Sequence, residues 1–531
     1  MFGGAVGFLT AFLTVLLLER LVKPGPGNRA IFHGMSLLAA MPLVLFYLSL
    51  FMATYRPVFA TLFTIIVFLG IVVVNNAKFR VLQEPLVYSD FALLRQAIAH
   101  PRLYVGYIGP IKVAAVIAVG GTTIVGCLLY EPPVIDRDRP EEWIASLAYF
   151  AIFLGAIYLV VRGPLRNELR AILKSFGATT DVRDDVDKLS LVTSLIFYFF
   201  LAGESEEAGS HSRDIEVEDR ARKIEKGAQH PPIVAVQNES FFNARRILKT
   251  TPPGFLTNFE RMRQEALFEG RLRVPAWGAN TLRTEFAFLS GIPSDALGVD
   301  RFNPYLSYCN KPVWTIASYL KSIGYRTICV HPFHKSFFRR AKVYPNLGFD
   351  EFVDIASFSD SDRVGPYVSD AAVATKVEEL LDTRTEPVFI FVITMENHGP
   401  WSKDRVDVDP AIQAAAPRKS KALLQYLEHL QHADEMIGRI ADALRTKHDD
   451  SIFCFYGDHI PSMPKIFNAI GYNDPRTDYF IWRNGDASPS KSVQVSADAL
   501  GRLVLEAMVP AEVVPKDEAG LRRLAAGEGS S

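Results

Sequence analysis

The chain has 531 residues, of which 49% are hydrophobic, and it carries a formal net charge of −1. This length allows more than one domain. The near-neutral charge argues against nucleic acid as a partner, because nucleic-acid binding relies on a basic surface. Most long apolar runs lie before residue 165, whereas the later half has the composition of a soluble domain.

Five apolar runs near the N-terminus each approach the roughly 20 residues that a helix needs to cross a bilayer. They cover residues 3–22, 32–53, 57–75, 111–130 and 143–161. Because almost no charge interrupts them, we predict a transmembrane region over residues 1–165 and not five buried core helices. The first run lacks a basic start and a small-residue cleavage site, so we interpret it as an anchor and not as a cleaved signal peptide.

Residues 166–230 are predicted to form juxtamembrane helices followed by a charged linker. The apolar segment 189–203 is short, so it is either a sixth span or a helix lying on the membrane surface. Basic residues follow the first, third and fifth runs, and basic loops prefer the cytoplasm. With six spans this rule places the following domain outside the cytoplasm. With five spans, a catalytic domain outside the cytoplasm requires the N-terminus to lie inside and the basic loops outside. The sequence leaves both topologies open.

Residues 231–510 are predicted to form an α/β domain, and residues 511–531 a flexible tail. The domain alternates four strand-like runs, at 233–237, 326–331, 388–395 and 451–457, with helix-like segments at 254–267, 281–290, 312–323, 369–382 and 420–446. This alternation predicts a mainly parallel sheet covered by helices on both faces. In such sheets, functional sites form at the carboxyl ends of the strands.

Polar side chains follow each of the four strand-like runs closely: Glu239, His331, His398 and the pair Asp458-His459. Carboxylate and imidazole groups are good ligands for divalent metal ions. Asp458 could instead cap a turn, and Glu239 could cap the next helix, where a negative charge suits the helix dipole. Carboxylates in matching places on two strands favour the metal-binding interpretation.

Thr281 follows the small-residue turn Gly278-Ala279-Asn280 and opens a helix-like segment. Either Asn280 or Thr281 could be a simple helix N-cap. A hydroxyl at a helix N-terminus also lies in positive potential, and a nearby metal ion can lower its pKa for nucleophilic attack. Metal ligands combined with a hydroxyl nucleophile indicate group transfer from a phosphate-type ester.

Two further segments carry groups that suit an anionic substrate. The segment 331–340, HPFHKSFFRR, offers His331 and one of two arginines, and arginine suits bidentate recognition of phosphate. His398, in the segment ENHGPW, could stabilise a leaving oxygen or act as a general acid. A basic surface turn and a turn histidine are the alternative interpretations of these two segments.

Five segments together resemble the lipoteichoic acid synthase family, which includes related phosphoglycerol transferases and belongs to the alkaline phosphatase–sulfatase superfamily. The segments are QNES at 237–240, GANTLRTEF at 278–286, HPFHKSFFRR at 331–340, ENHGPW at 396–401 and YGDH at 456–459. The resemblance implies a multispan α-helical membrane region followed by a sulfatase-like α/β domain of the alkaline phosphatase type. It also implies a multi-pass protein of the bacterial plasma (inner) membrane with an extracytoplasmic, or periplasmic, catalytic domain.

The resemblance further implies a single divalent cation, usually Mn²⁺, although these ligand types also admit Mg²⁺ or Zn²⁺. Its implied ligands are Glu239, Thr281, Asp458 and His459. Thr281 is the implied nucleophile, which attacks phosphatidylglycerol, releases diacylglycerol and passes phosphoglycerol to a glycan or teichoic-acid-like acceptor. The residues that match head-group or catalytic positions are His331, Phe338, Arg340 and His398.

The chain departs from the family pattern around the head-group positions. Phe338 stands where the family commonly has Trp, and Phe333 where it can have Asp. Ile460-Pro461-Ser462 replaces a sequence of the Gly-Ile-Ser type. The metal ligands therefore match the family better than the residues that select the transferred group.

Four other functions compete with phosphoglycerol transfer. A phosphoethanolamine transferase or phosphodiesterase of the same superfamily is the alternative, but such transferases are often rich in disulfides, and the four cysteines here form no disulfide pattern. A sulfatase needs a Cys/Ser-x-Pro-x-Arg motif, which the chain lacks. A non-enzymatic membrane sensor would have lost a metal ligand, and all four candidate ligands are present.

Overall fold

The computed structural model describes residues 2–25, 34–99, 101, 109–134, 140–175, 179–202, 230–401 and 405–509. Its contacts divide the chain into two compact units, residues 1–202 and 203–531. The charged linker up to residue 229 and the tail 511–531 lie outside the described residues, so these two predictions stay predictions.

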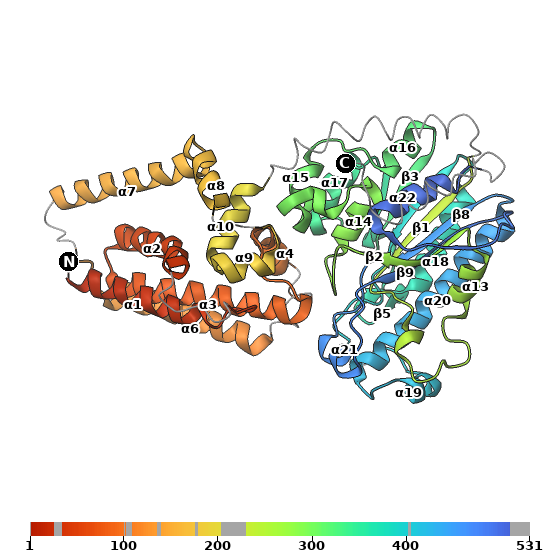
Figure 1. The fold of residues 1–531 in the computed structure, drawn as a ribbon, viewed down its shortest axis with the longest axis horizontal. Helices are drawn as coiled ribbons and strands as arrows, with labels where there is room; N and C mark the ends of the chain where they lie inside the picture. Colours follow the sequence, from red (N-terminus) through yellow and green to blue (C-terminus); the bar gives the residue numbers. More distant parts are fainter. Residues whose placement is uncertain are drawn as a thin grey trace. The chain divides into compact units, whose positions relative to one another are not determined.

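The first unit consists of helices. The longer ones are α1 (Phe2–Glu19), α2 (Gly34–Thr54), α3 (Pro57–Leu82), α6 (Pro110–Tyr130) and α7 (Pro140–Val161). The shorter ones are α4 (Leu94–Ala99), α8 (Leu165–Ser175), α9 (Val182–Leu189) and α10 (Leu191–Leu201). Helix α3 packs against α1, α2 and α6 (Figure 1), and α10 packs against α8 and α9.

Three described helical segments are long and apolar enough to cross a membrane: Pro57–Leu82, Val113–Tyr130 and Trp143–Val161. They coincide with the third, fourth and fifth predicted spans. The other predicted spans fall on the shorter apolar segments Ala5–Glu19, Pro42–Thr54 and Leu191–Leu201, so the total number of spans stays a prediction.

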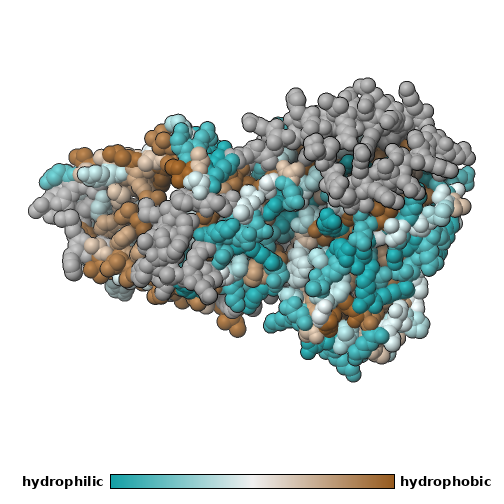
Figure 2. Space-filling view, in the orientation of Figure 1, coloured by the Kyte–Doolittle hydropathy of each residue, from teal (hydrophilic) through white to brown (hydrophobic). Residues whose placement is uncertain are grey.

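Exposed apolar side chains support a membrane location for this unit. On α7, Ile144 and Ile152 are each 68% exposed. Figure 2 shows hydrophobic residues gathered over the helices of the first unit and hydrophilic residues over the visible face of the second. A large apolar surface of this kind suits contact with lipid.

The second unit is built on one mixed sheet with the strand order β10-β2-β9-β8-β1-β7-β3-β4, and β11 pairs with β2. The strands are β1 (Ile233–Asn238), β2 (Phe268–Arg273), β3 (Arg326–Val330), β4 (Glu351–Val353), β7 (Val388–Ile393), β8 (Ile452–Gly457), β9 (Thr477–Arg483), β10 (Lys491–Ser492) and β11 (Val495–Ser496). β8, β1, β7, β3 and β4 run parallel, whereas β9 is antiparallel to both β8 and β2. A separate hairpin pairs β5 (Arg363–Val364) with β6 (Tyr367–Val368).

Helices cover both faces of this sheet (Figure 1), as the alternating pattern predicts. One core contains side chains of α13 (Thr257–Glu265), α18 (Asp370–Thr383) and α20 (Lys421–Lys447). The other contains side chains of α14 (Thr281–Ser290), α16 (Ile316–Ser322), α17 (Arg340–Asn346) and α22 (Ala497–Glu506). Strand β1 joins both cores, because Val234 and Val236 lie in the first and Ile233 and Ala235 in the second. Shorter helices are α15 (Pro304–Ser307), α19 (Pro410–Ala415) and α21 (Pro464–Ile470).

The predicted fold class is confirmed, with one addition at the edge of the sheet. The four predicted strands are β1, β3, β7 and β8, and they form the parallel centre. Beyond β8, this centre is extended by β9, which is antiparallel to β8, and by β2, which is antiparallel to β9. The sequence reasoning did not identify these two strands.

Candidate active site

The four predicted strands bring four polar segments to one edge of the sheet. β8, β1, β7 and β3 are parallel neighbours, so their carboxyl ends share that edge. Glu239, His331 and the Asp458-His459 pair directly follow β1, β3 and β8, and His398 lies in the loop after β7. Electrostatic interactions link His398 to both Asp458 and His331. The structure therefore places these sequence-predicted residues together.

Glu239, Asp458 and His459 form a buried cluster whose spacing suits a metal ion. One ligand atom from each residue lies within 4.8 Å of the others. The His459 Nε2 atom is 3.3 Å from Asp458 Oδ2 and 3.6 Å from Glu239 Oε1. Two ligands bonded to one ion at about 2.1 Å lie about 3 Å or more apart. The observed separations thus suit a shared cation better than they suit hydrogen bonds.

The hydrogen bonds around this cluster leave the ligand atoms available. His459 Nδ1 donates to the Ile460 carbonyl at 3.0 Å, so the Nε2 lone pair is presented to the cluster. Asp458 Oδ1 accepts from the backbone amides of Ser240 and His459, both at 2.8 Å. The buried Asp458 Oδ2 has no hydrogen-bond partner among the described residues. Buried polar atoms are normally satisfied, and a divalent cation at this cluster would satisfy this one.

The pKa shifts of the two carboxyl groups also favour a bound cation. Burial, together with the charge of Asp458, raises the pKa of Glu239 to about 8. Burial also raises the pKa of Asp458. A bound divalent cation stabilises the ionised carboxylates and opposes both shifts. The residues present therefore fit a divalent metal ion.

Thr281 is the first residue of α14 and is partly exposed, whereas Glu239 and Asp458 are buried. Burial raises the pKa of both carboxylates, and the nearby Thr281 hydroxyl offsets a small part of that rise. The preceding residue, Asn280, has a left-handed backbone with φ of 69°, a conformation that Asn tolerates better than most residues. The predicted nucleophile thus joins the cluster as its most accessible member.

Two glycines allow close backbone approaches around the site. A Cβ atom on Gly457 would lie 1.8 Å from the Phe241 carbonyl oxygen, so only glycine fits before Asp458. Gly278 has φ of 71°, and a Cβ there would lie 3.0 Å from the Ser462 Cβ. Ser462 therefore lies beside the turn that leads to the nucleophile.

His398 is held by the loop that carries it and by the β5–β6 hairpin. Its Nδ1 donates to the Gly399 carbonyl at 2.7 Å, and the Tyr367 hydroxyl contacts both groups at 3.2 Å. The Arg405 guanidinium donates to the His398 carbonyl at 3.1 Å and lies 5.7 Å from the Tyr367 ring centre. Burial lowers the pKa of His398. The ring is therefore neutral at pH 7, with Nδ1 protonated and Nε2 as a proton acceptor.

His331 is buried and both of its ring nitrogens have partners. Its Nδ1 donates to the Ile393 carbonyl at 3.0 Å, and its Nε2 accepts from the Arg340 guanidinium at 3.2 Å. Burial, with a further contribution from the Arg340 charge, lowers the pKa of His331. Its position beside β7 is fixed by these two bonds.

Arg340 is 1% exposed and forms a two-point ion pair with the buried Glu285. Its Nε and Nη2 atoms donate to the two carboxylate oxygens at 3.2 and 2.7 Å. The hydroxyls of Tyr305 and Tyr344 donate to the same carboxylate. The Arg340 guanidinium is therefore bound by the protein's own side chains, and its direct contact with a head group stays a prediction.

Two aromatic side chains of the 331–340 segment are partly exposed: Phe333 and Phe338. The Phe338 ring lies 5.2 Å from the Arg340 guanidinium carbon, within cation–π range. Phe338 also adopts a left-handed backbone, with φ of 52°. Its predicted role in substrate binding is not tested by these contacts and stays a prediction.

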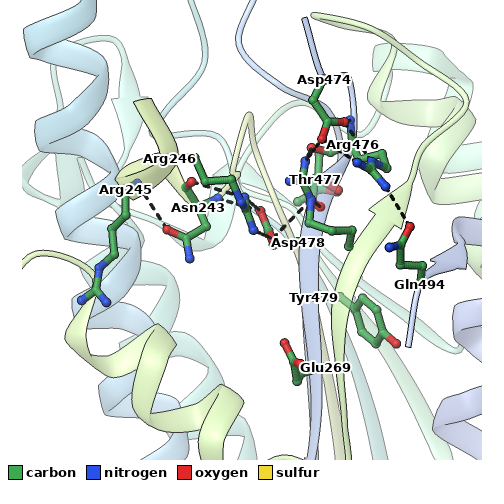
Figure 3. Close-up of polar contacts among 12 residues, drawn as sticks. Asn243, Arg245, Arg246, Glu269, Asp474, Arg476, Thr477, Asp478, Tyr479 and Gln494 are labelled. Atoms are coloured by element: carbon green, nitrogen blue, oxygen red, sulfur yellow. Dashed lines mark hydrogen bonds and ion pairs between the residues drawn. The ribbon is translucent and has the colours of Figure 1, made fainter. Parts of the chain in front are cut away.

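The buried Asp478 of β9 supports the loop that follows β1 (Figure 3). Asp478 accepts from the Asn243 backbone amide at 2.7 Å and from the Arg246 guanidinium at 2.8 and 2.5 Å. The neighbouring Thr477 hydroxyl donates to the Gly457 carbonyl at 2.8 Å. The unpredicted strand β9 thus holds the backbone on both sides of the Glu239–Asp458 cluster.

The sequence reasoning missed several polar residues that surround the site. The Glu396 side chain accepts from His429 and His432 on α20 at 2.7 and 2.6 Å. Glu285 and Tyr367 were missed as well. Glu285 and Glu396 stand inside the segments GANTLRTEF and ENHGPW, but the sequence does not indicate which residues they contact.

The pattern of the Sulfatase family matches residues 232–509, which is more than half of the chain. The chain belongs to the sulfatase family. Members of the wider superfamily use divalent metal ions, in agreement with the donor set at Glu239, Asp458 and His459.

Individual relatives extend this assignment. The chain is 29% identical over 454 residues to the capsular polysaccharide biosynthesis protein RkpI of Rhizobium meliloti, covering 84% of this chain and 81% of RkpI. It is 26% identical over 140 residues to lipoteichoic acid synthase 1 of Bacillus subtilis, covering 26% of this chain and 21% of that protein. These similarities confirm the predicted place of the chain in the superfamily beside lipoteichoic acid synthases.

Among solved structures, the phosphoglycerol transferase GacH of Streptococcus pyogenes, in complex with sn-glycerol-1-phosphate, aligns with a TM-score of 0.45. It is 21% identical, and the alignment covers 62% of this chain and 88% of GacH.

Proposed function

We propose that this protein is a membrane-anchored, metal-dependent phosphoglycerol transferase that uses phosphatidylglycerol as donor and a glycan or polyglycerolphosphate as acceptor. The observation that supports it best is the partly exposed Thr281, at the start of α14, beside a buried carboxylate–histidine cluster with metal-ligand spacing. A nucleophile with this environment suits transfer through a covalent phospho-threonine.

In this proposal Glu239, Thr281, Asp458 and His459 hold the cation, with Mn²⁺ as the first candidate and Mg²⁺ or Zn²⁺ as alternatives. The bound ion supplies positive charge that favours the deprotonated Thr281 oxygen. The position of Thr281 at the N-terminus of α14 adds to the same effect, because that end of a helix is positive.

The proposed reaction has two steps. In the first, Thr281 Oγ forms a bond to the donor phosphorus and the bond from phosphorus to the diacylglycerol oxygen breaks. The Thr281 proton passes to the released diacylglycerol, and the Nε2 acceptor of His398 is the group proposed to carry it. In the second, an acceptor hydroxyl oxygen forms a bond to the phosphorus and the bond from phosphorus to Thr281 Oγ breaks. The acceptor's proton returns to the Thr281 oxygen, and the phosphoglycerol leaves on the acceptor.

The apolar helices of the first unit support a lipid donor. A catalytic unit tethered to a bilayer meets membrane lipids at a high effective concentration, which a soluble enzyme would not gain. We place the protein in the bacterial inner membrane with its catalytic unit outside the cytoplasm. The name of the relative RkpI, which refers to capsular polysaccharide, supports a glycan as the acceptor.

The proposal is tested by incubating the full-length protein with Mn²⁺ and vesicles of phosphatidylglycerol or phosphatidylethanolamine, and by measuring diacylglycerol release. We expect release from phosphatidylglycerol by the wild type and by Thr257→Ala, which alters an exposed threonine on α13. Thr281→Ala should release none. Release from phosphatidylethanolamine alone would replace the proposed donor, and full release by Thr281→Ala would contradict the mechanism.

A further inference from the structure

A second carboxylate–histidine cluster lies beside the candidate active site. Glu396 is two residues before His398, and its side chain is fully buried. Its Oε1 atom accepts from His429 Nδ1 at 2.7 Å and from His432 Nδ1 at 2.6 Å. Its Oε2 atom accepts from the backbone amide of Asp370, at the start of α18, at 2.6 Å. Both oxygens of Glu396 are therefore engaged.

The spacing in this cluster is that of hydrogen bonds. One ligand atom from each of Glu396, His429 and His432 lies within 4.8 Å of the others, as in the first cluster. Ligands that share one ion at bond lengths of about 2.1 Å lie about 3 Å or more apart. The Nδ1–Oε1 distances of 2.6 and 2.7 Å fall below that value and are typical of N–H donors bound to a carboxylate.

The loop 394–398 joins this cluster to the candidate active site. At its start, the Thr394 hydroxyl accepts from the Glu239 backbone amide at 3.0 Å and from the Asn238 side chain at 3.1 Å. At its end lies His398. The Arg405 guanidinium donates to the carbonyls of Glu396 and His398 at 3.3 and 3.1 Å. Glu396 therefore lies midway between a contact to a candidate metal ligand and the candidate proton carrier.

We propose that Glu396, held by His429 and His432, is a positioning residue that fixes the loop 394–398 and thereby places Glu239 and His398. The part of this inference that concerns His398 rests on the proposed function, whereas the part that concerns Glu239 does not. The cluster is a hydrogen-bonded support from α20 and α18, and it holds no metal ion of its own. Outer residues that orient metal ligands commonly change metal affinity about 10- to 100-fold when they are replaced.

Glu396→Gln is the sharpest substitution, because it keeps the size of the side chain. The amide oxygen can still accept from the two histidines, but the amide nitrogen then faces the Asp370 backbone N–H, and two donors cannot bond each other. His432→Asn is the milder variant, because His432 is partly exposed and His429 keeps its bond to Glu396. Glu435→Gln, at an exposed position on the same helix, is the matched control.

The test measures Mn²⁺ binding and metal content of the full-length protein and its variants, with kcat and KM for the donor. We expect one ion per chain throughout, with Mn²⁺ bound about tenfold more weakly by Glu396→Gln. The kcat of this variant should fall more than its KM changes. His432→Asn should show a smaller loss in the same direction, and Glu435→Gln none.

Three results would overturn the inference. One is Mn²⁺ affinity and kcat within twofold of wild type in both Glu396→Gln and His432→Asn. Another is a second ion per chain that Glu396→Gln removes. The third is a loss confined to folding, with the remaining folded Glu396→Gln binding Mn²⁺ as tightly as wild type. If the wild type transfers nothing, the proposed function fails, while the Mn²⁺ titration still decides the role of Glu396.

Discussion

Two clusters of similar composition lie side by side at the carboxyl edge of the sheet. The distances between the polar atoms within each cluster distinguish the two. In the first, His459 Nε2 lies 3.3 and 3.6 Å from the carboxylate oxygens of Asp458 and Glu239. In the second, two histidines lie 2.6 and 2.7 Å from Glu396 and both donate to it. Residue types alone would suggest two metal sites, whereas the distances indicate one metal site and one support.

The largest expected effect comes from removing a ligand of the first cluster. Asp458→Asn replaces a buried carboxylate oxygen with an amide, a much poorer ligand for a hard divalent cation. We expect loss of the bound metal and a fall in donor cleavage of at least about 1,000-fold. Metal content and diacylglycerol release measure both effects. Asp442→Asn, at an exposed site on α20, should change neither, and a metal-replete Asp458→Asn protein would contradict the ligand assignment.

A steric test addresses the backbone beneath the same cluster. Gly457→Ala places a methyl group where the Phe241 carbonyl oxygen would lie 1.8 Å away, so β8 or the loop after β1 must shift. We expect a loss of about 3 kcal/mol in the free energy of unfolding, together with weaker Mn²⁺ binding. Gly471→Ala meets no atom within 4 Å, although its φ of 69° disfavours alanine, so it should cost about 1 kcal/mol. Equal losses in the two variants would contradict the close approach at Gly457.

A smaller effect is expected from the hairpin that contacts His398. Tyr367→Phe removes a hydroxyl 3.2 Å from both His398 Nδ1 and the Gly399 carbonyl. The bond between His398 and Gly399 remains, so the loss should equal about one hydrogen bond, which is a two- to tenfold fall in kcat. Mn²⁺ affinity should change little, because the Tyr367 hydroxyl bonds to His398 and to the Gly399 carbonyl. A larger loss of metal binding than of kcat would refute this separation.

The smallest effect concerns the dependence of stability on pH. Hydrogen bonding to Glu396 raises the pKa of His432 to about 9, against about 6.5 in an unfolded chain. The folded protein binds this proton more tightly, so the pair stabilises it fully below pH 6.5 and the contribution is lost as the pH rises through 9. Between pH 6.5 and 9, the Tm of His432→Gln should therefore fall by about 3 °C less than the Tm of wild type. Parallel Tm curves would show that the pair is not ionic.

Much of the fold followed from local patterns. The apolar runs of β1, β3, β7 and β8 predicted the parallel centre of the sheet, because strands buried on both faces lack polar alternation. All seven residues of β9 are buried as well, but they include Asp478 and Arg483, and the sequence reasoning did not identify this strand. Its antiparallel pairing depends on contacts with β8 and β2 that no local pattern records.

The candidate site was predictable where residues follow strands and unpredictable where side chains pair over long distances. Glu239 and Asp458 were found because they end apolar strands. Arg340 was predicted to bind substrate, but its bond to Glu285 depends on packing between two helices that are 55 positions apart in the chain. The hydrogen bonds that His429 and His432 of α20 donate to Glu396 likewise join residues far apart in the chain.

The central claim is most directly tested by the mass of the Thr281 peptide. The full-length protein would be incubated with Mn²⁺ and mixed phospholipid vesicles without acceptor, then digested. The account predicts a phosphoglycerol increment on Thr281, absent in Asp458→Asn. Diacylglycerol release from a protein whose Thr281 peptide stays unmodified, or an increment on another residue, would contradict it.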